Sequence, residues 1–280
     1  ATERLAFEGQ FRVDTYSETT TDWSARAAAL LALDKEQRHV LRLAAAKAFR
    51  APLLVLRGLG TERGPLPAPP FPPGLFAVTL NYPQGLDHEE VYSAEAGYTG
   101  RFSDQVDVRV NAYFNRYTNL IGVVPTSATP FAATLDNIDG ATGYGVESEL
   151  NYSYDGGRMY AWYAYNALDL DRPDQDVRAF YPPDHSVGLG VRHELCEGLT
   201  GNADFRYTNS SRISSLTTSA GATSQLDLAL TMKVLESRGE VQVGVHDLFD
   251  STSSAVLNLG GTNPHETPGR TLFVRFQYRF

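Results

Sequence analysis

Histidine, serine and aspartate side chains could carry out catalysis in this chain, but their spacing does not favour it. The six histidines are dispersed at positions 39, 88, 185, 193, 246 and 265. The nearest pair is His185 and His193, and on one strand this even separation places both rings on one face but ~26 Å apart, too far to share a metal ion. Asp184 precedes His185, yet no nucleophile elbow supplies a serine. We therefore expect neither an enzyme nor a metal centre.

Cysteine content and net charge exclude further classes. Cys196 is the single cysteine, so the sequence offers no intrachain disulfide and no thiolate metal cluster. The formal net charge of −9 argues against a nucleic-acid partner, because no basic patch could neutralise phosphates. No motif points to a bound cofactor. Residues 1–25 contain no basic segment followed by an apolar core, so no signal peptide is expected among them.

Alternation of apolar and polar residues with a period of two is the dominant pattern, and it predicts an all-β fold. Val106, Val108 and Val110, for example, alternate with Asp107 and Arg109. Each predicted strand is near the ~9–11 residues that a tilted strand needs to cross a bilayer. About twelve strands are expected, at 3–16, 22–33, 38–49, 89–102, 105–117, 141–154, 158–169, 185–195, 199–208, 223–234, 239–247 and 270–280.

The predicted connections alternate between short and long, after a first one of middling length at 17–21. The short ones are 34–37, 103–104, 155–157, 196–198 and 236–238. The long ones are 50–88, 118–140, 170–184, 209–222 and 248–269. Outer-membrane barrels have this asymmetry, with short periplasmic turns and long extracellular loops. The pattern predicts a transmembrane antiparallel β-barrel segment whose strands follow one another as a meander.

Aromatic residues and charged residues fit the same orientation. Rings are expected at both membrane interfaces. Next to the long loops these are Tyr16, Trp23, Phe114, Tyr165 and Tyr207, and next to the short turns or the terminus they are Phe102, Tyr152, Tyr154, Tyr278 and Phe280. The polar positions of the strands predict an inward-facing set with both signs of charge. It comprises Glu8, Arg12, Arg42, Glu95, Asp107, Arg109, Glu147, Glu149, Arg192, Asp204, Arg206, Asp227, Arg275 and Arg279.

Several segments resemble the C-terminal half of the β-barrel of TonB-dependent outer-membrane receptors. They are Lys47-Ala48-Phe49-Arg50-Ala51-Pro52, the segment 90–98 followed by 112–117, Tyr144-Gly145-Val146-Glu147-Ser148-Glu149-Leu150, and Val245-His246-Asp247-Leu248-Phe249-Asp250. The last is similar to the family's Asn-Leu-Phe-Asp motif, with Asp247 in place of the usual Asn. The order and spacing of these motifs extend over residues 1–280.

The resemblance implies a receptor in the bacterial outer membrane that imports a scarce nutrient, most often an iron–siderophore complex. Its implied partners are outer-membrane lipid, the TonB complex reached through a plug domain, the barrel-assembly machinery and a metal chelate or other small nutrient. The family has a plug inside a barrel of about 22 strands. Neither the plug nor the N-terminal strands are recognisable here, so 1–280 is expected to be the C-terminal portion of such a barrel.

Substrate contacts are expected mostly in the long loops, as the resemblance implies. Loop 51–88 is the largest and contains a proline-rich stretch, and its candidate contacts are Phe76, Tyr82 and His88. At the end of the chain, aromatic residues at alternate positions resemble the signal read by the barrel-assembly machinery. These are Phe276, Tyr278 and Phe280.

Two other functions remain open from the sequence. A self-contained twelve-stranded outer-membrane enzyme, such as a phospholipase, would need Ser186 or Ser148 beside a histidine of a neighbouring strand. An autotransporter translocator barrel would need an N-terminal helix through the pore, whereas residues 1–16 have the pattern of a strand. An unclosed sheet would expose unpaired edges at 3–16 and 270–280, which predicts aggregation of the isolated segment.

Overall fold

Eighteen strands make up the regular structure of the part of the chain that the structure describes. The computed structural model describes residues 4–16, 21–52, 61–65, 77–81, 85–128, 131–171, 181–211, 221–235, 238–251, 254–255, 265–266 and 269–279. Among these residues, no helix is long and apolar enough to cross a membrane.

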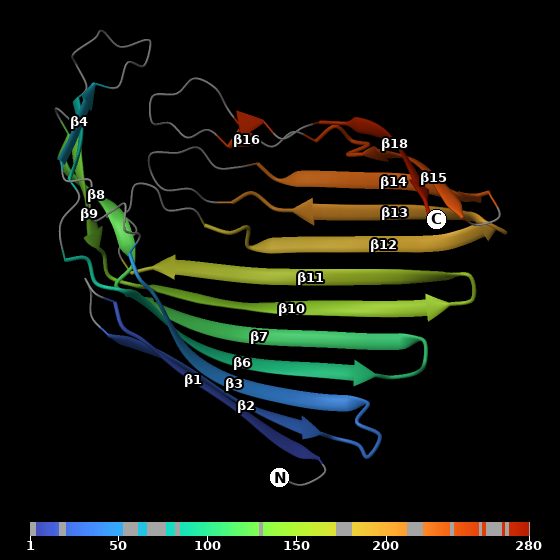
Figure 1. Ribbon diagram of the computed structural model, residues 1–280, viewed down its shortest axis with the longest axis horizontal. Helices are drawn as coiled ribbons and strands as arrows, with labels where there is room; N and C mark the ends of the chain where they lie inside the picture. The colour runs from blue at the N-terminus through green and yellow to red at the C-terminus, as the bar shows by residue number, and fades with distance from the viewer. Residues whose placement is uncertain are drawn as a thin grey trace.

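Twelve strands form one sheet in which each strand pairs antiparallel with the next wall strand along the chain. They are β1 (Leu5–Asp14), β2 (Asp22–Ala32), β3 (His39–Arg50), β6 (Glu89–Arg101), β7 (Val106–Thr118), β10 (Ala141–Tyr154), β11 (Gly157–Leu170), β12 (His185–Cys196), β13 (Leu199–Thr208), β14 (Thr223–Val234), β15 (Gly239–His246) and β18 (Thr271–Tyr278). Figure 1 shows this curved wall, with the short turns at one end and the long loops at the other. We call these the turn end and the loop end. The predicted meander of twelve strands is confirmed.

One face of the wall is apolar. Side chains alternate between the two faces of a strand, so register partners across the sheet share a face. Phe7, Leu43, Leu189 and Phe276 are among its large exposed side chains, as expected for contact with lipid rather than water. Within the wall strands, this apolar face carries only four charged residues, all close to the loop end. They are Lys47, Glu90, Arg116 and Asp169.

Histidines at both ends of the apolar face pair with tyrosines. At the turn end, the Nδ1 atoms of His39 and His193 lie 2.7 Å and 3.3 Å from the hydroxyl oxygens of Tyr98 and Tyr154. At the loop end, His185 Nδ1 lies 2.8 Å from the Tyr163 hydroxyl. His185 and His193 thus share a face but lie at opposite ends of β12. Both stand beside tyrosines at the two ends of the strands, where the sequence predicts aromatic rings at membrane interfaces.

The opposite, polar face is held together by ion pairs. Residues of this face on five neighbouring strands, β12 to β15 and β18, line one pocket. Six arginines of this face pair with an acid on the same or an adjacent strand. The pairs are Arg12–Asp14, Arg42–Glu95, Arg50–Glu89, Arg101–Asp107, Arg109–Glu149 and Arg206–Asp227.

Aromatic rings cross glycines on the polar face and reach the strand beyond. Tyr160 of β11 has Gly190 of β12 as register partner, and Gly190 in turn has Asp204 of β13. A Cβ atom at Gly190 would overlap the Tyr160 ring, whose hydroxyl donates to Asp204. Tyr113 of β7 crosses Gly145 of β10 in the same way, and its hydroxyl donates to Asn166 of β11. Gly145 is the register partner of both residues. These glycines are needed because the rings occupy the space of their side chains.

Long loops contain further strands that the sequence did not predict. Thr61–Pro65 (β4), Ala77–Asn81 (β5), Ile121–Ala128 (β8) and Phe131–Asn137 (β9) form a four-stranded sheet, which stands beyond the loop end of the wall (Figure 1). β5 and β9 pair in parallel and join two different loops. A two-stranded ribbon, Ser254–Ala255 (β16) with His265–Glu266 (β17), lies in the last loop. These strands are short, and their pairings depend on segments distant in sequence.

Leu235 begins the turn after β14 with a φ of 52°, in the left-handed region. A Cβ in this region costs about 1 kcal/mol, and asparagine tolerates it better than leucine. Replacing the exposed Leu235 by asparagine is expected to raise the free energy of unfolding by about 0.5–1 kcal/mol. Denaturant titration of the folded receptor measures this. Leu235→Ala is the control, because alanine keeps the Cβ atom and should bring no gain in stability. An Asn variant no more stable than the Ala variant would contradict the proposed backbone strain at this position.

Candidate functional site

Three consecutive residues before and at the start of β6 tie the loop end of the wall together. His88 pairs with Asp22 of β2. Glu89 and Glu90 form ion pairs with two residues of β3, Arg50 and Lys47 respectively. We call His88, Glu89 and Glu90 the rim clamp. Glu89 and His88 are among the few buried polar residues of the described chain. The clamp fixes the end of the longest loop against the second and third wall strands.

The rim clamp also contacts the four-stranded sheet formed by β4, β5, β8 and β9. Glu89 Oε1 accepts the backbone N–H of Ile121, the first residue of β8, at 2.9 Å. At the end of β9, the Asn137 side chain donates to the carbonyl oxygens of Asp87 (3.1 Å) and Asn119 (2.8 Å). Beside these bonds lies a small apolar core. Its buried members are Leu86, Leu135, Ile138 and Ala141. Two long loops are therefore packed together at their bases.

Asp171, which follows β11, forms a second link at the loop end. Arg116 Nη1 donates to Asp171 Oδ1 at 2.8 Å, and the Gly140 N–H donates to Oδ2 at 3.0 Å. The Arg116 guanidinium, aided by the Gly140 N–H, holds the pKa of Asp171 below its ordinary value of 3.8. The stabilisation from a lowered carboxyl pKa is fully present above that value. It is lost as the pH falls through the lower pKa of the folded state.

Protection of the Gly140 amide should therefore depend on the protonation of Asp171. We expect its hydrogen-exchange protection factor to fall as the pH drops below 3.8, because a neutral carboxyl binds Arg116 weakly. Asp171→Asn should show low protection throughout this range and no pH step. A wild-type protection factor that stays constant through this window would contradict the link.

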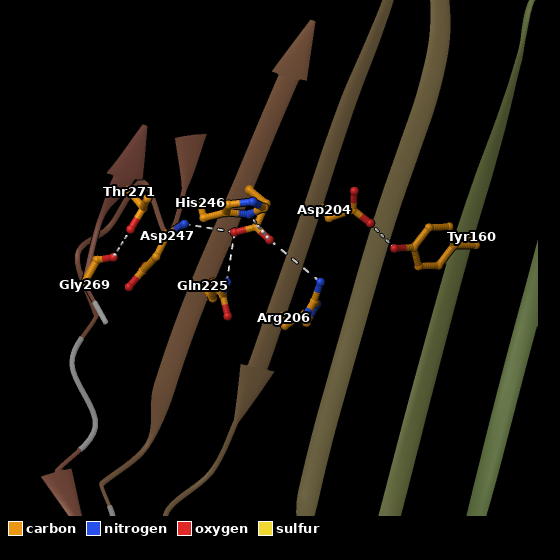
Figure 2. Close-up of polar contacts among 9 residues, drawn as sticks. Tyr160, Asp204, Arg206, Gln225, His246, Asp247, Gly269 and Thr271 are labelled. Atoms are coloured by element: carbon orange, nitrogen blue, oxygen red, sulfur yellow. Dashed lines mark hydrogen bonds and ion pairs between the residues drawn. The ribbon is translucent and has the colours of Figure 1, made fainter. Parts of the chain in front are cut away.

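The pocket on the polar face has a volume of about 480 Å³, and Asp227 is one of its lining residues. Asp227 Oδ1 accepts the Gln225 amide and the backbone N–H of Asp247, both at 2.9 Å. Its Oδ2 atom lies 3.3 Å from His246 Nδ1 and 3.7 Å from Arg206 Nη2. Figure 2 shows these groups converging from β13, β14 and β15. One carboxylate thus orients donors from three strands.

The motif around Asp247 follows β15 at the loop end, directly after the pocket residue His246. Asp247 is buried, has a φ of 53°, and accepts the N–H of Ser251 on Oδ2 at 2.8 Å. Asp250 in turn accepts the N–H of Arg270, at the other end of the last loop, at 2.7 Å. Asparagine and aspartate tolerate the left-handed conformation better than most residues. The motif is therefore a turn that joins both bases of the last loop.

The residues singled out in the sequence are not brought together. Phe76, Tyr82 and Phe280 lie outside the described residues. His88 is only 5% exposed and packs between the rings of Tyr16 and Phe49, so its role as a ligand contact stays a prediction. Phe276 and Tyr278 lie on the apolar face of β18, and their role as an assembly signal is likewise untested. Sequence reasoning missed Asp22 and Glu89, which no local pattern marks.

An enzymatic centre has no support among the described residues. Neither Ser148 nor Ser186 hydrogen-bonds a histidine there, and the two serines lie on opposite faces of the wall. In the same part of the chain, no group of three or more His, Cys, Asp or Glu side chains could hold a metal ion. Asp227 in the pocket and Glu89 and Glu90 in the rim clamp bind neighbouring groups of the protein itself.

Known proteins share this fold. Residues 1–248 match the family model described as TonB dependent receptor-like, beta-barrel. No curated protein matches the sequence. Among solved structures, the siderophore receptor PirA from Acinetobacter baumannii is 16% identical, with a TM-score of 0.75 over 100% of this chain and 44% of that one.

Two further structures are similar to the same extent. A mutant of the ferric enterobactin receptor PfeA from Pseudomonas aeruginosa is 17% identical (TM-score 0.75, 99% of this chain and 43% of that one). The copper transporter OprC is also 17% identical (TM-score 0.76, 100% and 46%). The chain spans less than half the length of these structures. Their family consists of outer-membrane transport receptors of Gram-negative bacteria rather than enzymes. The chain belongs to the TonB-dependent receptors, and it forms part of their outer-membrane β-barrel.

Proposed function

We propose that this chain is the C-terminal portion of the barrel of an active-transport receptor that imports a metal chelate, most simply an iron–siderophore complex, with energy supplied through TonB. In this arrangement the remaining strands close the barrel against β1 and β18, and a plug domain fills the lumen and contacts TonB. The chain itself forms part of the barrel wall, the loops above it and the lining of the lumen, and it catalyses no reaction.

The observation that carries the proposal is the four-stranded sheet that the rim clamp holds at the loop end of the wall, beyond its polar face. We call this sheet and the rim clamp the platform. The four-stranded sheet and the rim clamp hold two long loops together above the lumen. Such a platform can present a surface to a ligand larger than a bare ion. Two of the similar structures bear the description of siderophore receptor or ferric enterobactin receptor, which supports a chelate as the cargo. One is described as a copper transporter, which keeps the identity of the metal open to test.

Uptake of a labelled chelate tests this function. Deletion of the gene in its own host should abolish TonB-dependent uptake of one ⁵⁵Fe–siderophore, and a plasmid copy should restore it. A parallel assay with copper salts examines the second kind of cargo. If the deletion strain loses copper uptake but still takes up every iron chelate offered, the cargo is copper rather than an iron chelate. No change in uptake of either metal would contradict transport of metals altogether.

Aromatic residues at the end of β18 are proposed to be recognised by the barrel-assembly machinery. Phe276 is 60% exposed on the apolar face, so its ring is available to a protein that receives the unfolded barrel. Phe276→Ala combined with Tyr278→Ala should lower the amount of receptor in the outer membrane several-fold. Val274→Ala, on the same face, is the control. Equal outer-membrane levels of the two variants would contradict a specific role for the rings.

A further inference from the structure

Two arginines face each other on the polar face near the turn end. Arg158 of β11 and Arg192 of β12 are register partners, and we call them the lower arginine pair. Side chains of register partners start about 4.5–5.5 Å apart at Cβ, and like charges in this position destabilise a sheet. Neither arginine makes an ion pair or side-chain hydrogen bond with any other described residue. Six other arginines of the same face each pair with an acid, whereas Arg158 and Arg192 face each other without one among the described residues.

Acids near the lower arginine pair are already engaged. Asp204 accepts the Tyr160 hydroxyl, and Asp227 is surrounded by Arg206, His246 and Gln225. Glu194 is the next residue of β12 on this face. Its Oε1 atom lies 3.4 Å from the N–H of Gly198, in the turn beyond the strand. No described carboxylate therefore forms an ion pair with either arginine.

Each arginine of the pair has a neutral polar register partner on its other side. Asn202 is the register partner of Arg192, and Ser153 is the register partner of Arg158. Arg192 and Asn202 also line the pocket of the polar face. Guanidinium forks bind carboxylates and phosphates through paired N–H donors.

We propose that the lower arginine pair, with Asn202, forms a binding site for a carboxylate or phosphate group inside the barrel. The anion would lie between the two guanidinium groups and remove their repulsion. It could belong to a transported chelate or a free anion that enters the lumen. It could equally be an acidic side chain of a domain that fills the lumen. The site needs a closed barrel, but it does not depend on which cargo the receptor carries.

Thermal unfolding of the purified full-length receptor in detergent tests the site, because the proposal predicts the direction in which the unfolding midpoint changes. About 10 mM inorganic phosphate, compared with chloride at equal ionic strength, should raise the unfolding midpoint by about 2–4 °C if the anion comes from solution. Arg192→Gln should lose this rise. Arg26→Gln is the matched control, because Arg26 lies on the same face with Gln10 and Ala46 as register partners and should keep the wild-type response.

The other source of the anion gives a different pattern. If an acidic side chain occupies the site, phosphate has no effect on the wild type, but Arg192→Gln lowers the midpoint by a similar amount and Arg26→Gln does not. If the pair holds no anion, removal of one charge relieves repulsion. A midpoint that rises or stays constant in Arg192→Gln, without a phosphate effect in the wild type, would overturn the proposal. The assay contains no siderophore, so its failure leaves the proposed transport function untouched.

Discussion

Replacing Glu90 by alanine is expected to lower the free energy of unfolding of the receptor by about 3–5 kcal/mol. Glu90 Oε1 lies 2.6 Å from Lys47 Nζ, and Lys47 is only 9% exposed on the apolar face. The ammonium also lies 4.4 Å from the centre of the Trp23 ring. Without Glu90, a buried cation on the lipid-facing side would lose its only ion-pair partner among the described residues. Urea titration of the folded receptor measures the loss.

Two variants distinguish this cost from a general effect of removing a charge. Lys47→Met combined with Glu90→Leu removes both charges and should restore stability to within about 1 kcal/mol of wild type, because the pair then needs no compensation. Glu149→Ala breaks an exposed ion pair with Arg109, at 3.8 Å on the polar face, and should cost at most about 1 kcal/mol. Equal losses for Glu90→Ala and Glu149→Ala would show that the apolar setting of Lys47 is unimportant.

Replacing Gly190 by alanine is expected to cost about 2–4 kcal/mol, although one methyl group is added to a strand. The new Cβ would overlap the Tyr160 ring, which must leave its position across β12 and give up its hydrogen bond to Asp204. Overpacking typically costs about 1–3 kcal/mol, and loss of a hydrogen bond to a charged group about 1.5–3 kcal/mol. Partial relaxation of the ring keeps the expected total below the sum of the two.

A double-mutant cycle with Tyr160→Ala isolates this contact. In the Tyr160→Ala background, Gly190→Ala should cost less than about 1 kcal/mol, because the ring that it displaces is gone. Gly201→Ala is the control in the next strand, where the nearest neighbours of a Cβ would be the flexible Leu195 and Leu230 side chains, at 3.3 Å and 3.7 Å. Additive costs for Gly190→Ala and Tyr160→Ala would contradict the crossing of the glycine by the ring.

Most of the wall could be predicted because its signals are local. Alternation with a period of two is determined by adjacent residues, and it located all twelve wall strands within a few residues of their observed ends. The same alternation separated the apolar face from the polar one. Turn lengths then showed which strands are neighbours. None of these inferences requires knowledge of which distant segments meet.

The candidate site could be predicted only in part, because its contacts join segments that are distant in sequence. His88 was expected in a ligand-binding loop, but Asp22, Tyr16 and Phe49 arrive from three other segments and enclose it. The parallel pairing of β5 with β9 joins two loops that each contain proline or glycine and have no alternation of their own. A short strand of this kind is stable only when its partner is in place.

By itself, the sequence determined the strand order, the two faces and the asymmetry of the connections, since alternation and turn length act between neighbouring residues. Only the tertiary structure decided the register, and the register decides the chemistry. It places Arg158 opposite Arg192 and Tyr160 across Gly190. A shift by one residue would exchange the faces of a strand, and no single strand contains the information about its partner's side chains. Charge balance and ring packing across the wall are therefore properties of the assembled sheet.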